Sequence, residues 1–328
     1  MPIVYRLSIL MHRGIHFSAA RAEASILLSV TDRQVYSRAM TGSARNEAGK
    51  KFPAKSRRSS RGSTTGAQAS RHDPLFNDSV QKALAVLEAF GQGRRVLKLA
   101  EAAEVAGITK ASAQRCIHTL EVLGYLRRDR RGTGWSLTPR ALSIAHAYLF
   151  GYRLIEQATR HLVDLNRATG ESVSLSEPDG TDMVFIARFP SHKRFLIDFP
   201  VGTRLPMYST ASGRAYLSAL PAEEAQRVLQ GSSLRALTPM TITDPRRIVA
   251  LIDGARHHGY ACSDQESYRG DLTVAAAVIG PGGHPVGAIN ISAPTSRWTL
   301  EEMRARLAPL LIETARAVSS GAVPQAHG

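Results

Sequence analysis

The chain has 328 residues, a formal net charge of +15 and 43% hydrophobic residues, a composition that suits a globular protein with room for two domains. No apolar run approaches the ~18 residues that a membrane-spanning helix needs, so we expect no membrane partner. The two cysteines, Cys116 and Cys262, offer neither a disulfide framework nor metal-ligand spacing. The sequence therefore predicts a cytoplasmic protein with reduced thiols, no metal site and no cofactor.

The positive charge is concentrated toward the N-terminal end. Residues 1–72 carry 13 basic and 3 acidic side chains, residues 73–150 carry 11 and 7, and residues 151–328 carry 18 and 17. Basic segments attract polyanions through counterion release, whereas a neutral segment has no such attraction. We therefore expect the N-terminal part to bind nucleic acid and the C-terminal part to bind a small molecule or a second copy of the chain.

Residues 1–72 are predicted to be a disordered basic tail, because residues 41–72 are rich in Ser, Gly, Arg and Lys and contain few large apolar residues. The run Ser56–Arg61 is either solvated or contacts DNA phosphates without sequence preference. The first forty residues are poor in acids, as in a transit peptide, and Met40 offers a later start. The last segment, 321–328, is also predicted to be disordered.

Residues 76–138 are predicted to form a winged helix-turn-helix domain. The first helix is expected to be capped by Asp78 or Ser79 and to end at Gly91 and Gly93. Its predicted buried face carries Val80, Ala83, Leu84, Leu87 and Phe90. A second short helix over about 99–105 and a turn that contains Gly107 then lead to a third helix, which is the helix-turn-helix spacing.

The third helix, Thr109–Leu120, has the pattern of a DNA-recognition helix. Ala113, Cys116, Ile117 and Leu120 form one narrow apolar stripe, and the outer face is small or basic, which suits a major groove. Taken alone, the same pattern also fits an ordinary amphipathic surface helix. The residues predicted to contact DNA from this helix and its cap are Thr109, Lys110, Ala111, Ser112, Gln114, Arg115 and His118.

A strand, a basic glycine-containing turn and a second strand follow, over 124–137. Such a hairpin, or wing, places its tip against phosphates or in the minor groove, although charged hairpin tips are also common in solvent. The ordered series of helix, helix, turn, helix and basic hairpin favours the winged helix. The arginines predicted at the tip, and predicted to contact DNA, are Arg127, Arg128, Arg130 and Arg131.

Residues 139–154 are predicted to be a linker helix that starts at Pro139 and has Leu142, Ala145 and Leu149 on one face. Residues 155–320 are predicted to form an α+β domain around an antiparallel sheet. Strands are expected at 172–176, 183–189, 195–199, 259–260, 273–279 and 285–292. Helices are expected at 154–169, from 212, from 221, at 245–258 and at 298–319.

Several segments resemble the IclR-type transcriptional regulator family. In the first domain these are S-V-Q-K-A-L-A-V-L-E-A-F, A-E-A-A-E-V-A-G-I-T-K-A-S-A-Q-R and T-L-E-V-L-G-Y-L. In the second they are V-G-T-R-L-P-M-Y-S-T-A-S-G-R-A-Y-L, G-Y-A-C-S-D-Q-E-S-Y-R-G and V-G-A-I-N-I-S-A-P. The resemblance spans about residues 79–320. Ser112-Ala113 departs from the family's usual Thr-Val pair, which could alter the bases that are read.

The resemblance implies a ligand-responsive regulator with a GAF-like effector-binding domain. It implies a palindromic double-stranded DNA operator bound by a homodimer or a dimer of dimers, with the linker helix helping to pair subunits, and control of a catabolic operon. It also implies an effector, most simply an organic acid, in a pocket on one face of the sheet. Carried over by motif, the lining residues are Arg194, Ile197, Ala211, Ser212, Ser263, Thr273, Asn290 and Ser292.

The chemistry of these residues agrees with the implied pocket. Residues 211–213 open a helix whose first N–H groups could hold a carboxylate, and Arg194 favours an anion. Asn290 and Ser292 face the same side of one strand and need partners, which the ligand, the protein or water could supply. Arg269 and Asp271 stand where the family is usually apolar, and Ser263 where it is often acidic, so aromatic and aliphatic carboxylates both stay open.

Two other classes of function were weighed against the regulator. An enzyme is not favoured, because the sequence has no G-x-S-x-G, P-loop or H-E-x-x-H motif and Ser212 lacks an evident base. We therefore predict no catalytic residues. The other alternative is a general nucleic-acid-binding protein driven by the basic tail, in which case binding would depend on the tail and not on the winged helix.

Overall fold

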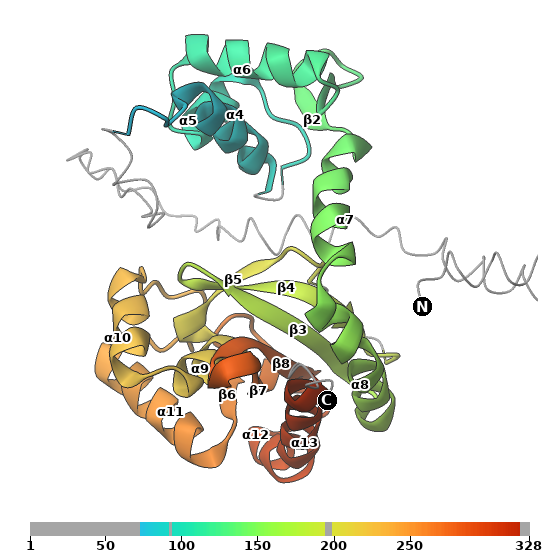
Figure 1. Cartoon of the computed structure of the whole chain (residues 1–328), viewed down its shortest axis with the longest axis vertical. Helices are drawn as coiled ribbons and strands as arrows, with labels where there is room; N and C mark the ends of the chain where they lie inside the picture. Colours follow the sequence, from blue (N-terminus) through green and yellow to red (C-terminus); the bar gives the residue numbers. More distant parts are fainter. Residues whose placement is uncertain (1–72, 92–93, 194–198, 322–328) are drawn as a thin grey trace, which may run out of the picture. The chain divides into compact units, whose positions relative to one another are not determined.

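The structure is a computed structural model that describes residues 73–91, 94–193 and 199–321 (Figure 1). The chain divides into two compact units at Thr138 and Pro139, and each unit has its own hydrophobic core. The segments 1–72 and 322–328, which the sequence predicts to be disordered, lie outside the described residues. The same is true of Gly93 and of 195–198 in the strand predicted at 195–199.

Three helices pack around the core of the N-terminal unit: α4 (Asp78–Glu88), α5 (Leu99–Val105) and α6 (Lys110–Val122). Asn77, and not Asp78 or Ser79, caps α4, because its side chain accepts hydrogen bonds from the amides of Ser79 and Val80. The predicted buried face is wrong at Val80 and Leu84, which are 54% and 51% exposed. The helix instead directs Val86, and the 3-10 turn after it Ala89 and Phe90, into the core.

The turn between α5 and α6 brings the recognition helix into place. Gly107 has a φ of +65°, a conformation that glycine adopts without strain, and the Thr109 hydroxyl accepts a hydrogen bond from the Ser112 amide at 3.2 Å. The helix bounds 99–105 and the cap at Thr109 are therefore confirmed. Ile117 lies at the centre of the predicted apolar stripe and is 2% exposed.

The wing consists of β1 (Leu126–Arg128) and β2 (Trp135–Leu137), paired antiparallel with Arg128 opposite Trp135. Asp129 organises the turn, because its carboxylate accepts hydrogen bonds from the amides of Arg131 and Gly134. The turn therefore begins at Asp129. Of the four arginines predicted at the tip, Arg127 and Arg128 lie on β1 instead, and Arg130 and Arg131 lie in the turn.

In the described part of the C-terminal unit, six strands form a sheet in the order β5-β4-β3-β8-β7-β6, in which every neighbouring pair is antiparallel. Their bounds are β3 (Ser172–Asp179), β4 (Asp182–Phe189), β5 (Arg204–Pro206), β6 (Ala261–Asp264), β7 (Asp271–Ile279) and β8 (Pro285–Pro294). The short strand expected at 259–260 is wrong, because Gly259, with a φ of +78°, caps the preceding helix. The predicted α+β class with an antiparallel sheet is confirmed.

Helices cover both faces of this sheet (Figure 1). One face packs against α8 (Arg153–Thr169) and α13 (Ala308–Gly321), and the other against α9 (Ala211–Ala219) and α11 (Pro245–His258), beside α10 (Ala222–Gly231). Alternation along β8 serves both layers: Ile289 and Ile291 face α8 and α13, while Ala288 faces α9. Asn290 and Ser292 share the face of Ala288.

The linker segment begins with a 3-10 turn at Pro139–Ala141 and continues as α7 (Leu142–Phe150). The helix therefore starts three residues later than predicted. No residue of α7 is buried, and Leu149 packs, half-buried, against the core beneath α8. In the described part of the chain, no helix is both long and apolar enough to span a membrane.

Candidate functional site

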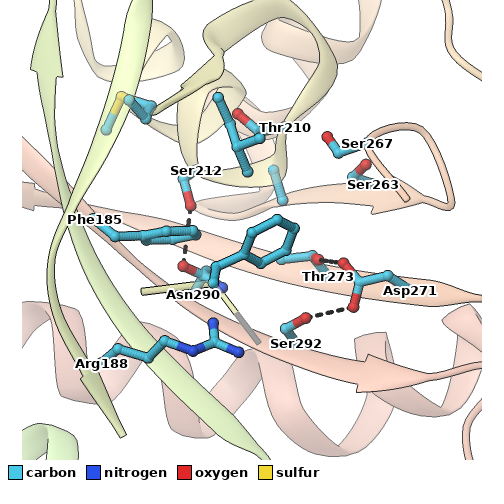
Figure 2. Close-up of a pocket in the computed structure, with 14 residues that line it drawn as sticks. Phe185, Arg188, Thr210, Ser212, Ser263, Ser267, Asp271, Thr273, Asn290 and Ser292 are labelled. Atoms are coloured by element: carbon cyan, nitrogen blue, oxygen red, sulfur yellow. Dashed lines mark hydrogen bonds between the residues drawn. The ribbon is translucent and has the colours of Figure 1, made fainter. Parts of the chain in front are cut away.

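A pocket that is partly open to solvent lies between the first turn of α9 and the sheet (Figure 2). The structure brings six of the residues predicted to bind an effector into its lining: Ala211, Ser212, Ser263, Thr273, Asn290 and Ser292. The other two, Arg194 and Ile197, lie outside the described residues.

The first turn of α9 is held tightly against the segment before it. Thr210 caps the helix, because its hydroxyl accepts a hydrogen bond from the Gly213 amide at 3.0 Å. A side chain at Gly213 would place its Cβ 2.2 Å from the Cα of Met207, so only glycine permits this packing. The amides of a first helical turn have no partner within the helix, and they give this end a partial positive charge.

Several polar groups of the pocket already have protein partners. The Ser212 hydroxyl donates to Oδ1 of Asn290 at 3.3 Å, and the hydroxyls of Ser263 and Ser267 both donate to the carbonyl of Ser209, at 3.2 and 3.1 Å. The expected alternative of protein partners therefore holds for these side chains. Each of these hydroxyls therefore has a protein partner in the pocket.

Asp271 is the buried acid of the pocket, with 8% of its surface exposed. One carboxylate oxygen accepts a hydrogen bond from the Ser292 hydroxyl and the other from the Thr273 hydroxyl (Figure 2). Burial raises the pKa of Asp271 to about 6, although the two hydroxyls and the charge of Arg188 act in the opposite direction. The sequence marked Asp271 as unusual but did not predict it in the lining.

Arg188 supplies a positive charge that the sequence did not predict at the pocket. A β-bulge pairs Leu175 with Ala187 and Ser176 with Phe185, so Ile186 is an extra residue in β4. Strict alternation would turn Arg188 away from Phe185, whereas the bulge places both side chains at the pocket. The guanidinium also donates to the Ser174 hydroxyl at 3.3 Å.

Aromatic rings form the wall beside this guanidinium. The ring centroids of Phe185 and Phe199 lie 5.9 Å apart, and the guanidinium carbon of Arg188 lies 5.9 and 5.8 Å from them. Met183 and Leu205 complete the apolar part of the lining. The pocket therefore combines a cation, two phenyl rings, a helix N-terminus and a buried carboxylate.

The surface predicted to bind DNA is exposed in the N-terminal unit. Lys110, Ala111, Gln114, Arg115 and His118 are exposed along α6, and Arg130 and Arg131 are exposed in the wing turn. Arg128 has an additional structural role. Its guanidinium carbon lies 4.0 Å from the centroid of the Trp135 ring, and its Nε lies 4.0 Å from Glu121, which also accepts a hydrogen bond from the Trp135 indole.

Two family models match the chain. The model of the IclR helix-turn-helix domain matches residues 79–130, and that of the bacterial transcriptional regulator IclR C-terminal domain matches residues 146–320. The chain belongs to the IclR family of transcriptional regulators. Its helix-turn-helix unit is a DNA-binding domain, and its C-terminal unit is of the effector-binding type. The relatives are regulators of transcription and not enzymes.

The sequence similarity between this IclR-family chain and its relatives extends over most of the chain. The Pca regulon regulatory protein of Pseudomonas putida is 33% identical over 250 residues, which cover 76% of this chain and 85% of the relative. The p-hydroxybenzoate hydroxylase transcriptional activator of Acinetobacter baylyi is 32% identical over 239 residues, 71% of this chain and 88% of the relative. A crystal structure of a transcriptional regulator from Rhodococcus sp. RHA1 has a TM-score of 0.65 at 34% identity, covering 75% and 98%.

The buried acid predicts a pH-dependent stability difference. A carboxyl whose folded pKa is about 6, against an ordinary value of 3.8, binds its proton more tightly in the folded protein. Its contribution to stability is therefore greatest below pH 4 and is lost as the pH rises through 6. The free energy of unfolding of Asp271→Asn, measured relative to that of the wild type, should therefore rise by about 1–3 kcal/mol as the pH is raised from 4.5 to 7.5.

The measurement is denaturant unfolding of the full chain at a series of pH values. Asp264→Asn is the matched control, because Asp264 lies on the adjacent strand β6 outside the pocket lining. Its stability difference from the wild type should change much less with pH. An Asp271→Asn difference that is the same at every pH would contradict the assigned environment of Asp271.

Proposed function

We propose that the protein binds an inverted-repeat operator as a dimer or a dimer of dimers and releases or remodels it when an aromatic carboxylate occupies the pocket beneath α9. The observation that supports the effector class is the grouping of Arg188 with the rings of Phe185 and Phe199. A guanidinium pairs with a carboxylate, and phenyl rings stack with a planar aromatic body. The N-terminus of α9 adds a second attraction for an anion.

The distribution of charge supports separate roles for the two parts of the chain, with the basic N-terminal part binding DNA and the neutral C-terminal part binding the effector. Residues 151–328 carry 18 basic and 17 acidic side chains, so this part has no general attraction for a polyanion and suits a small-molecule sensor. The helix α6 would read base edges, and the wing would contact the backbone or the minor groove. Control by the effector then requires two conformations of the protein that differ in their affinity for DNA, and an effector that binds one of them more tightly than the other.

The names of two relatives support an aromatic effector and a catabolic target. One is an activator for p-hydroxybenzoate hydroxylase, an enzyme of an aromatic carboxylate, and the other regulates the Pca regulon. These roles belong to those proteins. We extend to this chain the proposal that it controls a catabolic operon and responds to an acid of the same chemical class.

Substitution of Arg188 tests the effector proposal. Isothermal titration of the full chain with benzoate and its hydroxylated derivatives should show binding, and Arg188→Met should weaken it about tenfold or more, because a charge-assisted hydrogen bond is lost. Arg204→Met is the control, since Arg204 lies on the edge strand β5 and pairs with Asp179 and Asp182 at the surface. Equal affinity in the wild type and Arg188→Met, or binding of neutral molecules alone, would contradict the proposal.

Two arginine substitutions test the DNA proposal. Arg115→Ala, on the exposed face of α6, should reduce discrimination between a site selected from random duplexes and a scrambled duplex by about 1–3 kcal/mol. Arg130→Ala, in the wing turn, should weaken binding to both duplexes alike. It should also lower the number of counterions released on binding, taken from the salt dependence of the affinity, by about one. Fluorescence anisotropy over a range of salt concentrations measures both. If Arg115→Ala keeps full discrimination, α6 does not read the site through this residue.

A further inference from the structure

The pocket contains a charge that a site for a simple anion does not need. Asp271 is almost fully buried in the lining, on the same face of the sheet as Asn290 and Ser292 (Figure 2). A carboxylate there repels the carboxylate of an effector and costs free energy to bury. It therefore calls for hydrogen-bond donors, which the described residues of the pocket supply only in part.

The hydrogen bonds of Asp271 leave room for such a partner. Each oxygen of the carboxylate accepts one hydroxyl, from Ser292 on β8 or from Thr273 on β7. A carboxylate oxygen has two acceptor positions, so the two neutral donors found among the described residues fill about half of the capacity of this carboxylate. Within the described ranges, Asp271 has no salt bridge within 4.0 Å.

Among the residues that the structure describes, few charged groups lie around Asp271. Arg188 of β4 acts on it across the pocket, the neighbours on β7 and β8 are the hydroxyls of Thr273 and Ser292, and its amide donates to the carbonyl of Tyr268 at 3.3 Å. Burial raises the pKa of Asp271, and these groups offset the effect of burial only in part. At neutral pH the group is mainly ionised and is an acceptor facing the ligand space.

In the close-up view, Ser292 lies between Arg188 and Asp271 (Figure 2). An aromatic acid is therefore oriented by charge, with its carboxylate toward Arg188 and its other edge toward Asp271. An apolar ring edge at Asp271 would remove solvent from the carboxylate without donating a hydrogen bond to it. A hydroxyl on that edge would donate the missing hydrogen bond.

We propose that Asp271 is a specificity-determining residue that accepts a hydrogen bond from a ring hydroxyl, so that the preferred effector is a hydroxylated aromatic acid and not an unsubstituted one. This inference rests on the proposed aromatic carboxylate effector and adds a second functional group to it. No proton is transferred and no bond is broken in this role. The hydroxyl of the ligand donates, and Asp271 accepts.

The experiment compares four probes by isothermal titration of the full chain: benzoate and the 2-, 3- and 4-hydroxybenzoates. At pH 7.5, at least one hydroxybenzoate should bind the wild type about tenfold or more tightly than benzoate, because a site built for a hydroxyl rejects the analogue that lacks it. Asp271→Asn should reduce this preference to about threefold or less, because the variant binds that isomer more weakly. Asp264→Asn, the same chemical change outside the pocket, should keep it.

A second measurement needs no variant. Benzoate offers Asp271 no further donor, so its binding favours the protonated acid and strengthens as the pH falls from 7.5 to 5. A hydroxybenzoate favours the ionised acid, so its binding weakens over the same range. The affinity for the hydroxybenzoate divided by the affinity for benzoate, both measured with the wild type, should therefore fall as the pH is lowered through about 6.

Three results would overturn the inference. The first is a wild type that binds benzoate and all three hydroxybenzoates within about threefold of one another. The second is an Asp271→Asn variant that keeps the full preference, and the third is a ratio that does not change between pH 7.5 and 5. If none of the four probes binds, the aromatic carboxylate effector itself fails, and the role of Asp271 fails with it.

Discussion

A buried ion pair between Arg214 of α9 and Glu266 after β6 sets the geometry on which the pocket depends. Two hydrogen bonds of 2.5 and 2.6 Å join the guanidinium to the carboxylate, and the pair also binds the carbonyl of Tyr208 and the amide of Ile242. Two buried charges are tolerated only when this geometry is met. We infer that the pair holds α9 in one position on the sheet, and that this position leaves the ligand space beneath its first turn.

The chemistry of that space follows from strand geometry. Alternation places Asn290 and Ser292 on the α9 side of β8, while Ile289 and Ile291 fill the core on the other side. The same strands therefore stabilise the domain with one face and line the pocket with the other. Ligand chemistry can change through residues on the pocket face, such as Asp271, without disturbing the core beneath α8 and α13. This separation suits a sensor domain whose fold serves different effectors.

The helices and most strands could be predicted because their signals are local: Thr109 caps α6, Pro245 begins α11, and apolar periodicity marks most buried faces. The six predicted residues of the pocket came from motifs that resemble the family, and periodicity alone would not have grouped them. Arg188 was missed because a β-bulge shifts the side-chain alternation of β4, and a bulge depends on the partner strand. The exposure of Val80 and Leu84 depends likewise on how α4 packs, which its own sequence does not reveal.

The central claim is that a hydroxylated aromatic acid binds in the pocket between the first turn of α9 and the sheet, with its hydroxyl toward Asp271 of β7. Hydrogen–deuterium exchange of the full chain, with and without saturating hydroxybenzoate, tests it most directly, because bound ligand slows local opening. We predict slower exchange in peptides that cover Met207–Gly213 and Asp271–Ile279, with little change in α11. Saturated binding with protection confined to α6 and the wing, or with no protection near α9 and β7, would contradict the claim.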